Sequence, residues 1–243
     1  MSGVWEWFKR NVKPGTGEAP PKVDPPLENV SPIRPKPSAP LLWCPFAFIP
    51  PKAMKTSGRY EKGYPLGAVV HHSAGADAGI YEYGLEMGFT YFVINRDGRI
   101  LQGFPLDRYG SHAGVSKWPG LGESVSSKLV GIEVVSAGKL SHSSEGWKSW
   151  FGKYYNDHEV RTLSTNKENI QAGTYHKFTQ AQEESLIKLL RWLKENNPSV
   201  FSYDYVLGHD EVAGPAGIGY WRKNDPGGSL SMTMPELRKH LKG

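Results

Sequence analysis

The sequence predicts an α/β fold in which a mixed central β-sheet is flanked by helices. Short apolar segments typical of buried strands recur at residues 67–72, 90–95, 129–135 and 203–208. An amphipathic helical pattern after Thr179 separates the third of these segments from the fourth. Because strands and helices follow one another along the chain, a layered α/β architecture is the favoured arrangement.

Residues 1–40 are predicted to lie outside this domain, which then spans residues 41–243. Twelve of the 19 prolines fall between residues 14 and 51. Since proline fixes φ and lacks a backbone donor, we expect an extended linker at 14–40. The preceding segment is aromatic and basic, and Trp5, Phe8 and Val12 would share one face of a short helix. This arm could contact an anionic membrane or wall polymer, dock on its own domain, or lack fixed structure.

The strand segments differ in how they end. Residues 67–72 finish in two histidines, His71 and His72. The second segment runs into Asn-Arg-Asp-Gly at 95–98, a turn signal that predicts residues 99–102 as an antiparallel hairpin partner. The third segment carries one acidic residue, Glu133, in an otherwise apolar run.

Two helices are expected in the second half of the chain. Thr179 and Gln182 form a capping box, and residues 186, 189, 190 and 193, all leucine, give one apolar face. Asn196, Asn197 and Pro198 end this helix, and a second short helix is expected at residues 235–241.

The stretch at 138–175 is polar and aromatic with little periodicity, so we expect a long functional loop. Its aromatic residues, together with Trp118, could contact a substrate, and Trp118 is our candidate for that role. The alternative is a small hydrophobic cluster under the loop. The loop residues concerned are Trp147, Trp150, Tyr154 and Tyr155.

Composition narrows the classes of function. The formal net charge of +5 would attract polyanions, but the sequence has no helix-turn-helix pattern, RNA-binding signature or basic stripe, so we expect no nucleic-acid partner. A single cysteine, Cys44, excludes an intrachain disulfide. No secretory signal and no apolar run of ~18 residues is visible, so we expect synthesis in the cytoplasm and another route to any target outside the cell.

Two histidines and a carboxylate are candidates for a zinc site. His71 ends the first strand segment, His209 follows the fourth, and Asp225 lies in a loop farther on. Strand ends and the adjacent loops are where a scaffold holds converging side chains. Catalytic zinc sites use three protein ligands and leave a fourth position open.

Seven motifs in order resemble the type 2 N-acetylmuramoyl-L-alanine amidases, over roughly residues 65 to 230. This family includes phage lysins, the cytoplasmic amidase of muropeptide recycling and the peptidoglycan recognition proteins. Each motif is modest alone, but their order is specific. The motifs lie at residues 70–74, 91–98, 111–116, 130–133, 178–182, 208–209 and 223–227.

The resemblance implies a fold like that of the amidases and peptidoglycan recognition proteins, and a role for each matching residue. His71, His209 and Asp225 match the zinc ligands. Glu133 matches the catalytic glutamate of the recycling-type branch, and Lys223 matches a lysine near the developing oxyanion. The implied reaction is zinc-dependent cleavage of the amide bond between N-acetylmuramic acid and L-alanine in peptidoglycan.

Two further positions are read from the same resemblance. His112 matches a histidine of the substrate groove. Lysins related to the phage lysozyme-amidases carry a catalytic tyrosine before the second strand, but that position is Thr90 here. Tyr91 is one residue off and should point to the other side of the strand. Glu133 is therefore the better candidate for the general base.

Two other functions compete with that of a phage or prophage endolysin. A recognition module would bind peptidoglycan without cutting it, but such proteins lose a zinc ligand, and this chain keeps all three. Within the enzymes, a cytoplasmic recycling amidase would act on soluble muropeptides. A phage or prophage endolysin would be made in the host cytoplasm and released to the wall. The arm and the pI of about 9.1 favour the endolysin.

Overall fold

The computed structural model describes residues 39–75, 79–168, 170–214 and 222–243. The arm and nearly all of the linker predicted at 1–40 lie outside the described residues. Within the part that the structure describes, no helix combines the length and the apolar character needed to cross a membrane.

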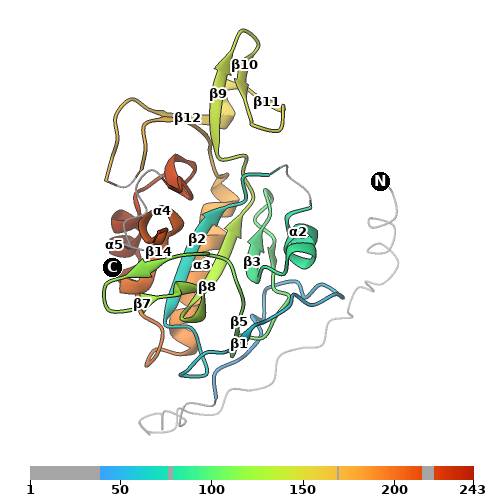
Figure 1. The fold of residues 1–243 in the computed structure, drawn as a ribbon, viewed down its shortest axis with the longest axis vertical. Helices are drawn as coiled ribbons and strands as arrows, with labels where there is room; N and C mark the ends of the chain where they lie inside the picture. The colour runs from blue at the N-terminus through green and yellow to red at the C-terminus, as the bar shows by residue number, and fades with distance from the viewer. Residues whose placement is uncertain (1–38, 76–78, 169, 215–221) are drawn as a thin grey trace, which may run out of the picture. The chain divides into compact units, whose positions relative to one another are not determined.

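The predicted mixed sheet is present and lies at the centre of the domain (Figure 1). Its strand order is β14, β2, β8, β3, β4, with the first four strands parallel and β4 antiparallel to β3. The strands are β2 (Gly67–His72), β3 (Tyr91–Ile94), β4 (Ile100–Leu101), β8 (Leu129–Val134) and β14 (Val206–Gly208). The fourth predicted strand is shorter than expected, because Tyr203–Tyr205 form a 3₁₀ turn, η3, before it.

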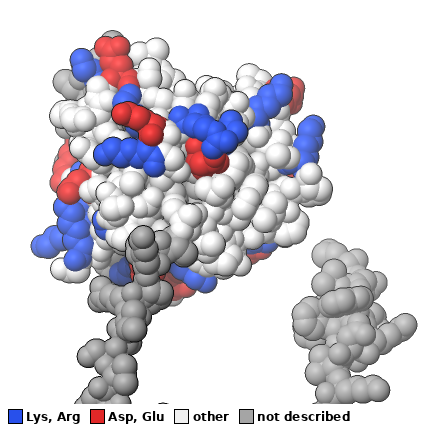
Figure 2. Space-filling model, turned by 90° about the horizontal axis from the view of Figure 1, so that it is seen from below, with Lys and Arg blue, Asp and Glu red and all other residues white. Residues whose placement is uncertain are grey.

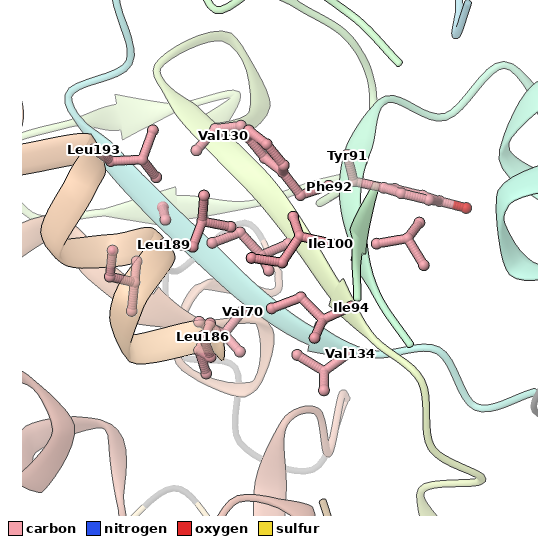
Figure 3. Packing of buried hydrophobic residues seen from close by; sticks show 14 of the residues in the cluster. Val70, Tyr91, Phe92, Ile94, Ile100, Val130, Val134, Leu186, Leu189 and Leu193 are labelled. Carbon is pink, nitrogen blue, oxygen red and sulfur yellow. The ribbon is translucent and has the colours of Figure 1, made fainter. Parts of the chain in front are cut away.

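Helix α3 (Gln180–Asn196) covers one face of this sheet (Figures 1 and 3). Thr179 caps it and Gln182 completes the predicted capping box. Figure 3 shows Leu186, Leu189 and Leu193 directed at sheet residues that include Val70 and Val130, and all five belong to one buried cluster. Because the side chains of a strand alternate between faces, every second strand residue packs under this helix.

The opposite face of the sheet holds a smaller apolar cluster and the polar residues of interest. Val69, Leu129 and Leu207 pack there with Val125 of a 3₁₀ turn, η1 (Val125–Ser127). His71 and Glu133 are each an even number of residues from a member of this cluster, so they project from the same face.

The remaining helices and 3₁₀ turns surround the sheet. Helix α2 (Ile80–Met87) lies beside β3, α4 (His209–Val212) begins where β14 ends, and α5 (Met234–Lys242) closes the chain. The 3₁₀ turns η2 (Asp157–Glu159) and η4 (Gly227–Ser229) lie in connections.

The stretch at 138–175 is not a long loop, which corrects the sequence-based expectation. It forms most of a second sheet, antiparallel throughout, in the order β11, β10, β9, β13, β12. These strands are short, and all but β13 are only partly buried, so they lack the apolar pattern that marks the central strands. Their bounds are β9 (Lys139–Ser143), β10 (Gly146–Lys148), β11 (Tyr154–Tyr155), β12 (Val160–Leu163) and β13 (Gly173–His176).

Two small two-stranded sheets complete the described fold. Strand β1 (Gly58–Arg59) pairs with β5 (Arg108–Tyr109), and β6 (Lys117–Trp118) pairs with β7 (Gly122–Glu123). On the face of the molecule shown in Figure 2, basic and acidic side chains are interspersed.

Candidate metal centre and active-site cleft

The three predicted zinc ligands meet at one point. His71 lies in β2 and His209 is the first residue of α4, directly after β14. Because β14 and β2 are parallel neighbours, both histidines come to the same edge of the sheet. The Nδ1 atoms of the two histidines are 3.1 Å apart, and Asp225 Oδ2 lies 3.0 Å from the first and 2.9 Å from the second.

The donor set fits a divalent cation such as zinc. A tetrahedral zinc site with bonds of about 2.0 Å places neighbouring ligand atoms ~3.3 Å apart, close to these separations. His209 Nε2 lies 3.2 Å from Ala113 O, a carbonyl that can only accept. A proton on Nε2 satisfies this carbonyl and leaves the Nδ1 lone pair for a metal. All three residues are buried, and burial lowers the pKa of His71 to about 4, which leaves its imidazole neutral at pH 7.

An ion pair fixes the turn that presents His209. Glu211 of α4 accepts a hydrogen bond from Gly208 N at 2.9 Å. It also forms two hydrogen bonds with Arg238 of α5, at 2.8 and 2.9 Å. Arg238 donates to Val206 O as well. Neither Glu211 nor Arg238 was predicted from the sequence. The sequence signal for this contact is the position of Glu211, three residues after the helix N-cap Gly208, where a glutamate commonly accepts from the N-cap N–H.

A cleft of about 360 Å³ opens over the three ligands. Glu133, Lys223 and His112 line it together with the ligands, and so do Arg222, Tyr83 and Tyr91. A depression of about 460 Å³ between Arg59 and Lys128 holds none of the predicted site residues.

Glu133 has the properties that a general base needs. It pairs with His71 across β2 and β8, so both side chains reach the same cleft. Among the described residues, its buried Oε2 has no hydrogen-bond partner. Burial, and then the charge of Asp225, raises the pKa of Glu133 to about 8, while Lys223 opposes the rise. This carboxylate can therefore accept a proton at mildly alkaline pH.

The other predicted residues occupy different positions. Lys223 is exposed at the cleft, two residues before Asp225. His112 Nδ1 lies 3.1 Å from His71 Nε2, so this histidine contacts a ligand besides lining the cleft. Trp118 packs beside the cluster of Val69 and Leu207 and does not line the cleft. Its position gives no support to the predicted role in substrate binding.

The expectation about Thr90 and Tyr91 is reversed. Tyr91 lines the cleft, whereas Thr90 is buried outside it and donates to Lys55 O. The Tyr91 ring extends away from α3 (Figure 3), and its hydroxyl donates to Ile80 O at 3.1 Å. The hydroxyl is thus bound to the backbone of α2, and Glu133 remains the candidate base.

The aromatic residues in and beside the second sheet divide between an exposed depression and a buried cluster. Tyr155, Trp147 and Phe151 join a small buried cluster, as the structural alternative predicts. Trp150 is 77% exposed, donates from Nε1 to Ala74 O, and lines a depression of about 430 Å³ with Tyr83. This depression shares Ser73, Ala74, Ile80 and Tyr83 with the cleft over the ligands.

Fold and site together define an α/β protein with a candidate metal centre in an open cleft. The chain belongs to the N-acetylmuramoyl-L-alanine amidase family, whose model matches residues 61–228. The match includes all the predicted ligands and both predicted catalytic residues.

Solved structures similar to this chain are distant in sequence. A selenomethionine derivative of AmpD is 20% identical, with 82% of this chain and 96% of that chain covered and a TM-score of 0.48. AmiD from E. coli, in complex with the substrate anhydro-N-acetylmuramic acid-L-Ala-D-gamma-Glu-L-Lys, is 20% identical, covering 72% and 58%, with a TM-score of 0.46. The endolysin LysCS from Clostridium intestinale is 19% identical, covering 81% and 98%, with a TM-score of 0.42. No curated protein matches the sequence. The family assignment therefore rests on the family model.

Proposed function

We propose that this chain is a zinc-dependent hydrolase that cleaves the amide bond between N-acetylmuramic acid and L-alanine in peptidoglycan. Membership of the amidase family supports the bond and the substrate class. The observation that carries the proposal is a buried oxygen of Glu133 that has no hydrogen-bond partner in the described part of the chain. It lies in the same cleft as the cluster of His71, His209 and Asp225.

Each residue has a defined part in such a reaction. A zinc ion held by His71, His209 and Asp225 would supply a Lewis acid and lower the pKa of water. Glu133 removes the proton from the attacking water and delivers it to the leaving amine of L-alanine. Lys223, a cation at the cleft, stabilises the oxyanion that develops on the scissile carbonyl.

The test is mass spectrometry of peptidoglycan digested by the full-length chain. We expect free stem peptides that begin at L-alanine, and we expect chelation of the metal or Glu133→Ala to abolish their release. Glu82→Ala is the matched control, because it removes an exposed carboxylate of α2 and leaves the cleft intact.

Two results would contradict the proposal. Fragments cut within the glycan would assign the chain to another reaction. A sample with stoichiometric zinc that leaves every muropeptide uncut would favour the recognition module.

We further propose that the enzyme is a phage or prophage endolysin that is made in the host cytoplasm and reaches the wall after release. The aromatic-basic arm at residues 1–13 and the net charge of +5 support this role. Through the arm, the enzyme would contact an anionic membrane or wall polymer. The alternative to an endolysin is a recycling amidase, which has little need for such an arm.

A further inference from the structure

The ring of His112 stands between a backbone carbonyl and a candidate metal ligand. Its Nε2 lies 2.9 Å from Leu129 O in β8, and its Nδ1 lies 3.1 Å from His71 Nε2. The two imidazole rings are nearly perpendicular, at 85°. His112 therefore uses both ring nitrogens, one for each neighbour.

The carbonyl determines which nitrogen carries each proton. Leu129 O can only accept, so Nε2 of His112 must carry its proton. In the neutral ring Nδ1 is then an acceptor, and the facing Nε2 of His71 must donate to it. His71 consequently has no proton on Nδ1, the atom directed at His209 and Asp225.

The backbone around His112 is shaped to hold the ring in this place. A Cβ atom on Gly131 would lie 2.7 Å from Cγ of His112, so a side chain at that position would displace the ring. Ser126 Oγ accepts hydrogen bonds from the backbone N–H groups of His112 and Ala113, at 3.2 and 2.9 Å. The missing side chain at Gly131 leaves room for the His112 ring, and the Ser126 hydroxyl holds the backbone that carries it.

We propose that His112 is a positioning residue that holds His71 in its Nε2–H tautomer, so that the Nδ1 lone pair is presented to the metal. This inference rests on the proposed function only in taking His71 as a metal ligand. Loss of a residue that hydrogen-bonds to a metal-ligating histidine commonly lowers metal affinity by ~10- to 100-fold. A neutral histidine adds no negative charge to a cleft that already contains Glu133 and Asp225.

The tautomers can be measured directly in the zinc-loaded full-length chain. Long-range ¹H–¹⁵N correlation spectra distinguish Nδ1–H from Nε2–H imidazoles. We expect both His112 and His71 to be neutral Nε2–H tautomers. Finding either histidine protonated on Nδ1 would overturn the inference.

Zinc affinity provides the second measurement, by competition with a chromophoric chelator. His112→Phe keeps a ring but removes the acceptor, and we expect affinity to fall by about 10- to 100-fold. His112→Asn offers an oxygen near the place of Nδ1 and should recover part of that loss. Gly131→Ala should weaken binding without changing any histidine.

A matched control separates this effect from the loss of any buried histidine. His176 is buried in the second sheet, where its Nδ1 accepts from Ala137 N at 3.0 Å. His176→Phe should leave zinc affinity at the wild-type value. Wild-type affinity in both His112→Phe and Gly131→Ala would refute the positioning role. Neither measurement uses a muropeptide, so a failure to cleave peptidoglycan would contradict the proposed function and leave this inference standing.

Discussion

The cleft residues are placed by the two-residue period of the central strands. Val70 projects under α3, so its neighbour His71 projects to the opposite face. The same alternation brings Glu133 of β8 and Tyr91 of β3 to that face. A single-residue shift in any of these strands would move the side chain out of the cleft.

At the residue scale, Lys223 provides a test of oxyanion stabilisation. Lys223→Met removes the cation at the cleft, and the loss of one such group typically lowers kcat by ~10²- to 10³-fold. We expect a small change in KM, because the charge acts mainly in the transition state. Steady-state kinetics on a soluble muropeptide would measure both.

Lys239→Met is the control for this substitution, since Lys239 is exposed on α5. An unchanged kcat in Lys223→Met, or an effect confined to KM, would remove the assigned role.

At the scale of elements, side-chain caps connect the helices to the rest of the fold. Gln182 caps α3 and also donates to Ile94 O and Val135 O, at 3.2 and 2.9 Å. Glu236 caps α5 by accepting from Thr233 N at 2.7 Å, and it accepts from Lys167 Nζ at 2.8 Å. Each cap therefore satisfies a helix end and adds a longer-range contact.

The cap of α5 predicts a pH dependence of stability. The hydrogen bond from Lys167, and then that from Thr233, lowers the pKa of Glu236 to about 2. A carboxyl with a depressed pKa contributes its stability above the unfolded value near 4.5 and loses it as pH falls toward 2. Glu236→Gln should therefore be less stable than wild type at pH 6, and the difference should vanish near pH 2.

Urea unfolding at several pH values would measure this difference. Lys167→Met keeps the carboxyl of Glu236 but should lose most of the same pH-dependent stability. Glu86→Gln is the control, because it removes an exposed carboxylate elsewhere on the surface. A constant difference between pH 6 and pH 2 would show that the cap does not act through this ionisation.

At the scale of the whole molecule, the arm can be separated from the catalytic domain by deletion. If the arm binds the wall or membrane, removal of residues 1–40 should slow cleavage of intact sacculi. Cleavage of soluble muropeptides should keep its wild-type rate, because the cleft lies within the remaining residues. Turbidity loss of sacculi and chromatography of soluble products would give the two rates.

Substitution of Trp5 and Phe8 by serine is the smaller version of the same experiment. Equal rates on sacculi for all three proteins would end the targeting idea. A wild-type enzyme active only on soluble muropeptides would favour the recycling amidase.

The periodicity of the sequence alone predicted four of the five strands of the central sheet, the hairpin that supplies the fifth, and α3 with its capping box. These features depend on local patterns: alternation in strands, a turn at residues 95–98, and leucines on one helical face. The ordered motifs also identified the family and named His71, His209 and Asp225. Strand and helix patterns and family motifs depend on residue type and spacing along the chain, so the sequence alone is enough to predict them.

Only the tertiary structure decided how these parts meet. The second sheet was missed because its strands are short and mostly half-exposed, and they pair through backbone hydrogen bonds that leave little trace in the hydrophobicity of the sequence. The contact of His112 with His71 and the ion pair of Glu211 with Arg238 join residues far apart in sequence. Their distances follow from strand register and packing, which act through space, and no pattern along the chain encodes them.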